Sequence, residues 1–145
     1  YTAAEDIYEY VESGGIAFVS LCSQTVTGTF GDLTTIWQGS DYTYLLDPEH
    51  PLLQNVDNPA WGNWSSHTSF SLIGEDWISL AENDYGESTL VYKDRFVVHG
   101  LTMELAGDGW SQQYIAGNSI DWALNLNSGV NWLTTDLAIK APSSR

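Results

Sequence analysis

The residues of this chain that could carry chemistry are one thiol, three imidazoles and many carboxylates, and their spacing favours no single reaction. Cys22 is the one cysteine of the 145 residues, so the chain can form no disulfide within itself. The three histidines, His50, His67 and His99, show neither the two-residue nor the four-residue spacing that places two zinc ligands on one face of a strand or helix. We therefore expect no metal site and no cofactor.

The carboxylates are numerous but do not define a site. They form no EF-hand loop, and the alternative that remains for calcium is the group Asp41, Asp47 and Glu49. A carboxylate pair for glycoside hydrolysis depends on a separation in space that sequence does not reveal, and no pair stands out.

Two indoles three residues apart form the candidate binding site. Trp61 and Trp64 lie within residues 55–66, a stretch with Pro, Gly and Asn that predicts a long polar loop. Exposed indoles stack on sugar rings or anchor protein interfaces, so we expect a binding role for both. The alternative is that one or both fold back over the core. The single N-glycosylation sequon of the chain begins at Asn63, between them.

The elements that must position these residues begin with a helix, two glycines and a strand. Apolar residues recur at helical spacing over residues 2–12, and Gly14 and Gly15 end that helix. The apolar run 16–21 is typical of a strand buried on both faces in a parallel sheet. This is half of a βαβ unit without its first strand, so we expect an unpaired edge that invites strand addition.

The remainder of the chain alternates between loops and short strand-like runs. Residues 22–40 are rich in Thr, Gly and Ser and predict mainly loop. Short strands are expected at 42–46, 67–73, 77–81, 88–92 and 95–101, with a hairpin turn at Lys93-Asp94 and a closing helix at 112–126.

The charge of the chain excludes several classes of partner. Nineteen acidic residues stand against four basic ones, and the net charge of -15 repels phosphate backbones and anionic lipid headgroups. We therefore expect no nucleic acid and no membrane insertion. Seven Trp and eight Tyr among many Ser, Thr, Asn and Gly residues favour an extracellular or cell-surface location. The absence of an initiator Met and a signal peptide predicts a processed product or an excerpt of a longer chain.

Four segments follow one another in an order shared with a known superfamily. They are residues 10–23 (helix, Gly-Gly, strand, polar elbow), 50–56 (His-Pro and apolar residues), 85–100 (a strand pair ending in His-Gly) and 118–123 (apolar-x-Trp-Ala). Together they resemble the class I glutamine amidotransferase-like superfamily, especially its trehalose-utilisation-type, non-amidotransferase branch. The resemblance implies a flavodoxin-like, layered α/β domain over residues 1–128, with a mostly parallel sheet, flanking helices and a missing N-terminal strand. Residues 129–145 resemble the start of an Ig-like domain and are predicted to be an extension or linker.

The resemblance also implies a catalytic site at Cys22, His99 and Glu104, and the sequence argues that this site is degenerate. A nucleophile elbow needs nearly side-chain-free residues two before and two after the nucleophile, yet these are Ser20 and Gln24. The His-x-Glu spacing of the superfamily is absent too, because His99 and Glu104 are five residues apart. We therefore predict no catalytic residue and interpret Cys22 as a small buried thiol at a strand end.

The leading hypothesis is a non-catalytic, amidotransferase-like module of a larger secreted or surface protein that serves assembly or binding. Its expected partners are other domains or copies of that protein, and carbohydrate. One alternative is a carbohydrate-active or amidase-type hydrolase whose site is completed by missing parts or by a partner. Another is an accessory domain of a secreted protease.

Overall fold

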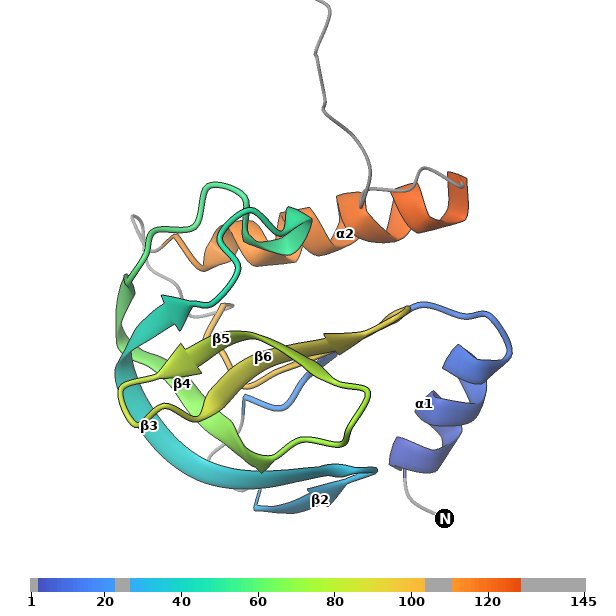
Figure 1. The fold of residues 1–145 in the computed structure, drawn as a ribbon, viewed down its shortest axis with the longest axis horizontal. Helices are drawn as coiled ribbons and strands as arrows, with labels where there is room; N and C mark the ends of the chain where they lie inside the picture. The colour runs from blue at the N-terminus through green and yellow to red at the C-terminus, as the bar shows by residue number, and fades with distance from the viewer. Residues whose placement is uncertain (1–2, 23–26, 104–110, 129–145) are drawn as a thin grey trace, which may run out of the picture.

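The computed structural model describes residues 3–22, 27–103 and 111–128 (Figure 1). In chain order its elements are α1 (Ala3–Glu12), β1 (Ala17–Ser20), β2 (Gly28–Phe30), β3 (Leu33–Leu45), the 3-10 helix η1 (Pro51–Leu53), β4 (Ala60–Leu72), β5 (Ile78–Asn83), β6 (Ser88–Lys93), β7 (Phe96–His99) and α2 (Gln113–Ser128). Residues 129–145 lie outside this part of the chain, so the predicted domain boundary stays a prediction. Neither of these two α-helices is both long and apolar enough to cross a bilayer.

The sheet is mostly antiparallel, and the predicted flavodoxin-like, mostly parallel α/β fold is wrong. Its strand order is β1-β7-β6-β4-β3-β2, and β5 pairs with both β3 and β6. Strands β3, β4, β6 and β5 thus pair in a closed circuit, a small barrel that the other strands extend. Among the described strands only β1 and β7 are parallel, and every other pair runs antiparallel.

Two segments predicted as loops are strands. Residues 22–40 contain β2 and most of β3, and residues 55–66 contain the first half of β4. Residues 22–40 carry Thr, Val, Ile and Trp, and residues 55–66 carry one Val and two Trp. These residue types favour strands and stand beside the Gly and Ser residues that suggested loops. The β2–β3 turn is held by Gly31, whose φ of 59° suits glycine, and a Cβ there would overlap the Tyr8 ring.

Several local predictions are confirmed. The predicted helices at 2–12 and 112–126 correspond to α1 and α2. The turn at Lys93-Asp94 joins β6 and β7 as an antiparallel hairpin, in which Lys93 pairs with Phe96 and Asp94 has a φ of 46°. The strand predicted at 16–21 exists as β1, but it pairs with the second strand of this hairpin and not with a strand of a βαβ unit.

Helix α2 covers one end of the barrel, beside η1 (Figure 1). Trp122 and Ile115 are buried in a core that includes Leu52 and Leu53 of η1. The Asn118 amide donates hydrogen bonds to two carbonyl oxygens of the same segment, those of Leu52 (3.1 Å) and Gln54 (2.9 Å). Apolar packing and these bonds together fix where α2 lies.

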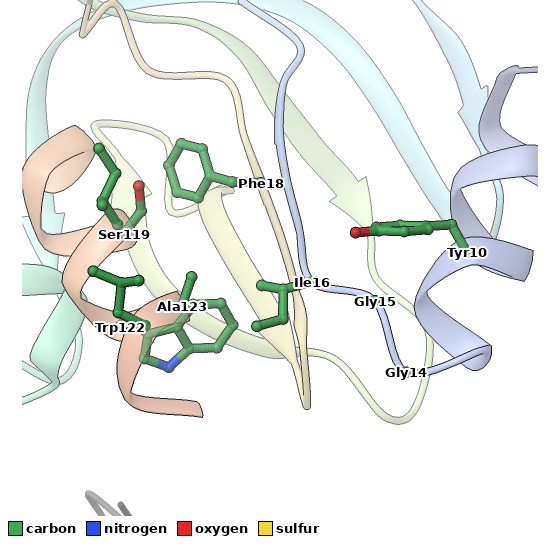
Figure 2. A pocket seen from close by; sticks show the side chains of 10 residues that line it. Tyr10, Gly14, Gly15, Ile16, Phe18, Ser119, Trp122 and Ala123 are labelled. Atoms are coloured by element: carbon green, nitrogen blue, oxygen red, sulfur yellow. The ribbon is translucent and has the colours of Figure 1, made fainter. Parts of the chain in front are cut away.

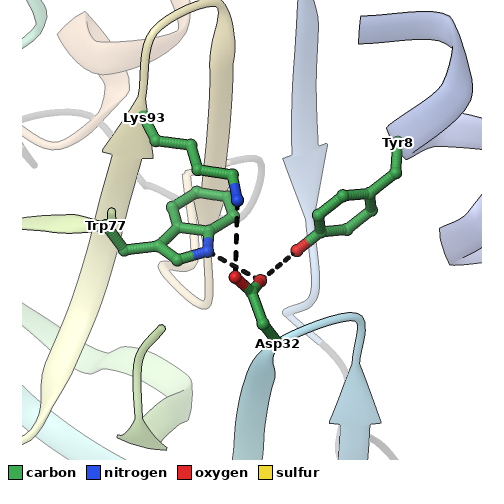
Figure 3. Close-up of polar contacts among 4 residues, drawn as sticks. All are labelled: Tyr8, Asp32, Trp77 and Lys93. Atoms are coloured by element: carbon green, nitrogen blue, oxygen red, sulfur yellow. Dashed lines mark hydrogen bonds and ion pairs between the residues drawn. The ribbon is translucent and has the colours of Figure 1, made fainter. Parts of the chain in front are cut away.

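Helix α1 is joined to the sheet by a cluster around one carboxylate, the Asp32 cluster (Figure 3). Asp32 accepts hydrogen bonds from the Tyr8 hydroxyl and the Trp77 indole (2.8 Å), and Lys93 Nζ lies 3.4 Å from its carboxylate. Partial burial of Asp32 opposes ionisation, but these donors and the lysine charge outweigh it and lower its pKa. The ammonium group of Lys93 also lies over the rings of Tyr8 and Trp77.

Removal of this carboxylate should destabilise the protein. Asp32→Ala leaves the buried Trp77 indole without its acceptor, and we expect a loss of about 1–3 kcal/mol in the free energy of unfolding. The measurement is urea denaturation at pH 7. Asp76→Ala, at an exposed position, is the control and should change stability by less than about 0.5 kcal/mol. Equal stability of the two variants would show that the Asp32 cluster does not secure α1.

Candidate functional site

Strand β1 is covered on both faces by helices. On one face Ala17 and Val19 pack in the core that also contains Ile7 and Val11 of α1. On the other face Ile16, just before β1, and Phe18 pack against the core that contains Trp122 of α2. Helices on both sides thus explain the apolar character of the run 16–19, although these residues are half-buried and not fully buried as the sequence predicted.

One edge of β1 is paired with β7, and no described strand pairs with its other edge. The Ala17 N–H donates to the carbonyl of Arg95 in the turn before β7 (3.0 Å), and the Leu21 N–H donates to the carbonyl of His99 at the end of β7 (2.8 Å). Because alternate residues of a parallel strand direct their amides to opposite edges, the N–H and C=O groups of Phe18 and Ser20 face away from β7. In the strand order of the described residues β1 is terminal, with β7 as its one neighbour.

A groove of about 430 Å³ runs beside this edge, between α1 and α2 (Figure 2). We call it the β1 groove. Its lining residues are Tyr10, Gly14, Gly15, Ile16, Phe18, Ser119, Ile120, Trp122, Ala123 and Leu124. Figure 2 shows the Tyr10 ring on the α1 side and Trp122 and Ala123 on the α2 side. The Tyr10 ring fits there because Gly15 has no side chain, and a Cβ at that position would overlap it.

The rim of the β1 groove is apolar and exposed. Tyr10, Ile120 and Leu124 have 57%, 63% and 62% of their surface exposed, respectively. The exposed Asp121 of α2 follows Ile120 in the sequence, whereas Glu12 of α1 lines a different pocket together with Lys93 and Arg95. The site therefore offers an apolar groove, a strand edge that no described strand pairs, and an acidic residue beside its α2 rim.

Sequence reasoning missed these groove residues. Ile120 and Leu124 are four residues apart on α2, and apolar residues at that spacing are typical of the buried face of a helix. The usable signal was the chain order of helix, two glycines and apolar strand, which predicted an unpaired edge without predicting the groove beside it.

The degenerate catalytic candidates are only partly brought together. Cys22 is half-buried and follows Leu21, whose amide bonds to the His99 carbonyl, so Cys22 and His99 lie at the same end of the β1–β7 pair. Glu104 lies outside the described residues. The described part of the chain contains no group of three His, Cys, Asp or Glu side chains that could hold a metal ion.

His99 has the environment of a core residue. Its ring is fully buried, packs 4.9 Å from the Phe18 ring between centroids, and accepts a hydrogen bond from the Leu101 amide (3.2 Å) at Nδ1. Burial lowers the pKa of His99 to about 4, so the imidazole is neutral at physiological pH. No described atom partners Nε2. The His99 ring packs against Phe18, and Phe18 lines the β1 groove.

The candidate binding residues Trp61 and Trp64 lie on β4 and not in a loop. The side chain of Trp64 is outside what the structure describes. Trp61 is 54% exposed and opposite Tyr42 of β3, and Tyr44 follows on the same face. These three residues form an exposed aromatic strip. The rings of Tyr42 and Tyr44 lie 6.4 Å apart, and the Asp84 carboxylate accepts hydrogen bonds from Ser40 (2.6 Å) and Tyr44 (3.2 Å).

Comparison with known proteins identifies a fold but no family. No family model matches the chain, and no curated protein matches it. It is similar to a solved structure from Thermoplasma acidophilum, described as a putative GMP synthase subunit, with a TM-score of 0.63 and 8% identity. The match covers 86% of this chain and 66% of that one, so the chain spans slightly less than two thirds of its length. At this identity the similarity concerns the fold alone.

The predicted membership of the glutamine amidotransferase-like superfamily is therefore corrected. The flavodoxin-like sheet that it implied is not found in the described residues, which form a small, mostly antiparallel, barrel-like sheet. No family model supports the four sequence segments. The hydrolase and protease-accessory alternatives stay predictions.

The buried imidazole of His99 should make stability fall in mild acid. The pKa of His99 is about 4 in the folded protein, against an ordinary value of 6.5 that we take for the unfolded chain. The unfolded chain therefore binds more protons between pH 4 and pH 6.5. The contribution of His99 is complete above pH 6.5 and decreases as the pH falls towards 4, by at most about 3 kcal/mol. His99→Asn retains an acceptor for the Leu101 amide and removes the titration. Denaturation at pH 7 and pH 4.5 should show a smaller stability difference for this variant, and an unchanged difference would contradict the assignment.

Proposed function

We propose that this chain is a non-catalytic module that binds another polypeptide and serves assembly within a larger protein. The observation that carries the proposal is the β1 groove, where an open strand edge and an exposed apolar surface occur together. Open edges of apolar strands tend to pair with other chains, and natural proteins usually cover them or break them with charge or proline. The run Phe18-Val19-Ser20 carries neither.

The charge distribution supports an assembly role. A net charge of -15 keeps separate copies apart in dilute solution, which counters the tendency of an open edge to aggregate. A partner with neutral or basic character would meet no such repulsion. The acidic, Trp- and Tyr-rich composition supports placing this larger protein outside the cell or on its surface.

The aromatic strip favours carbohydrate as a second ligand. Tyr42, Tyr44 and Trp61 expose their rings on one face of β3 and β4, where sugar rings could stack. The Asp84 carboxylate, held by Ser40 and Tyr44, provides a fixed acceptor for hydroxyl groups beside them. This binding would use a different face from the β1 groove and is compatible with assembly.

Self-association at high salt tests the proposed function. At about 1 M salt the charge repulsion is screened over a few ångströms, and a second copy should enter the exposed groove. We expect light scattering to show a mass that increases with protein concentration at high salt and stays monomeric at low salt.

Two matched charge variants locate the contact. Leu124→Glu, in the β1 groove, should abolish the association, whereas Leu72→Glu, equally exposed on β4, should not. Equal effects of both variants would show that the contact lies outside the β1 groove. A chain that stays monomeric under all conditions and also fails to bind an extended apolar peptide would contradict the proposed function.

A further inference from the structure

We propose that the natural occupant of the β1 groove is an extended strand of a different polypeptide, apolar in its middle and basic at its ends, which pairs with β1 as an added strand. This inference rests on the proposed function and specifies the chemistry of the partner. Three properties of the site carry it: the backbone groups of the edge, the side chains of the groove and the charge at its borders.

The backbone of β1 requires a strand. Phe18 and Ser20 each direct an N–H and a C=O group away from β7, two residues apart on one edge. An incoming extended segment satisfies these groups with its own main chain, as in recognition by β-augmentation. A helix satisfies its own amides and carbonyls internally and could not pair with this edge.

The side chains of the groove require an apolar strand. An added strand would lie between the same two layers as β1, with α1 on one face and α2 on the other. Side chains directed towards α2 would cover Ile120, Leu124 and Trp122, and two of these three are largely exposed without an occupant. Beside Gly14 a Cβ would meet no described atom within 4 Å, so larger side chains of the added strand are tolerated there, whereas the space at Gly15 is filled by the Tyr10 ring.

The charge of the chain disfavours a second copy as the natural occupant. Edge-to-edge pairing of two copies would bring together two modules of charge -15, each with the exposed Asp121 beside the α2 rim. A partner with lysine or arginine at the ends of its strand would instead gain attraction to this acidic chain. A copy is therefore expected in the groove only where salt screens the repulsion.

A short peptide tests this inference directly. The probe is a peptide of about five alternating Leu and Val residues with two lysines at each end, which matches a typical strand length. We expect isothermal titration or fluorescence anisotropy to show binding to the complete chain. Ser20→Pro removes an outward N–H and places a ring in the path of the added strand, and should weaken binding at least about tenfold. Ser20→Thr keeps the N–H and should change affinity by less than about twofold.

An N-methylated peptide gives a readout that does not depend on a variant. Methylation of alternate amides on the edge that faces β1 removes the backbone donors and leaves the side chains unchanged, so binding should be lost. Equal binding of the methylated and unmethylated peptides would overturn strand addition while leaving the proposed polypeptide-binding function intact. Strand addition would also be overturned, with the proposed function intact, if the peptide does not bind but copies associate at high salt through Leu124. Loss of both peptide binding and salt-induced association would refute the proposed function itself.

Discussion

Strand β1 packs against a helix on each face and, among the described strands, is paired at one edge. Helix α1 packs on one face and α2 on the other, so each helix has to be attached to the sheet independently. The Asp32 cluster attaches α1 through a carboxylate with three donors. Asn118 and the apolar contacts of Trp122 attach α2 to η1 and the barrel end. The groove between the helices follows from this arrangement.

The parallel β1–β7 pair joins the groove to the barrel. β7 is fully buried and belongs to the hairpin with β6, which is itself part of the closed circuit of strands. At its end Gly100 lies so close to the Thr68 backbone that any side chain would overlap it, and its carbonyl accepts from the amide of His67 (3.0 Å). His99 therefore lies at a crowded junction, which explains its burial and its low pKa better than a catalytic role does.

Sequence patterns predicted the local elements well where the signal is local. Helical periodicity located α1 and α2, and the Lys93-Asp94 turn located the β6–β7 hairpin. The apolar run at 16–21 correctly indicated a strand, but Ala17–Val19 are half-buried and Ser20 is exposed, so burial on both faces was wrong. Extending a parallel arrangement to the whole sheet was also wrong, because a single strand does not reveal the direction of its neighbours. Strands β3 and β4 were missed over much of their length, since Thr, Ser and Gly in a barrel strand resemble a polar loop. An unpaired strand edge was predicted, but the groove beside it was not. The groove depends on the distance between α1 and α2, which cannot be derived from residue spacing in the sequence.

Amide hydrogen exchange at β1 shows whether the edge that faces away from β7 is open, because it reports on each edge of the strand separately. In the isolated protein the amides of Ala17, Val19 and Leu21 are bonded towards β7, and we expect them to be protected. The amides of Phe18 and Ser20 face the open edge and should exchange faster than these neighbours, although the same helices cover the strand. Protection of Phe18 and Ser20 equal to that of Ala17, Val19 and Leu21 would show that the edge is already occupied and would contradict the account.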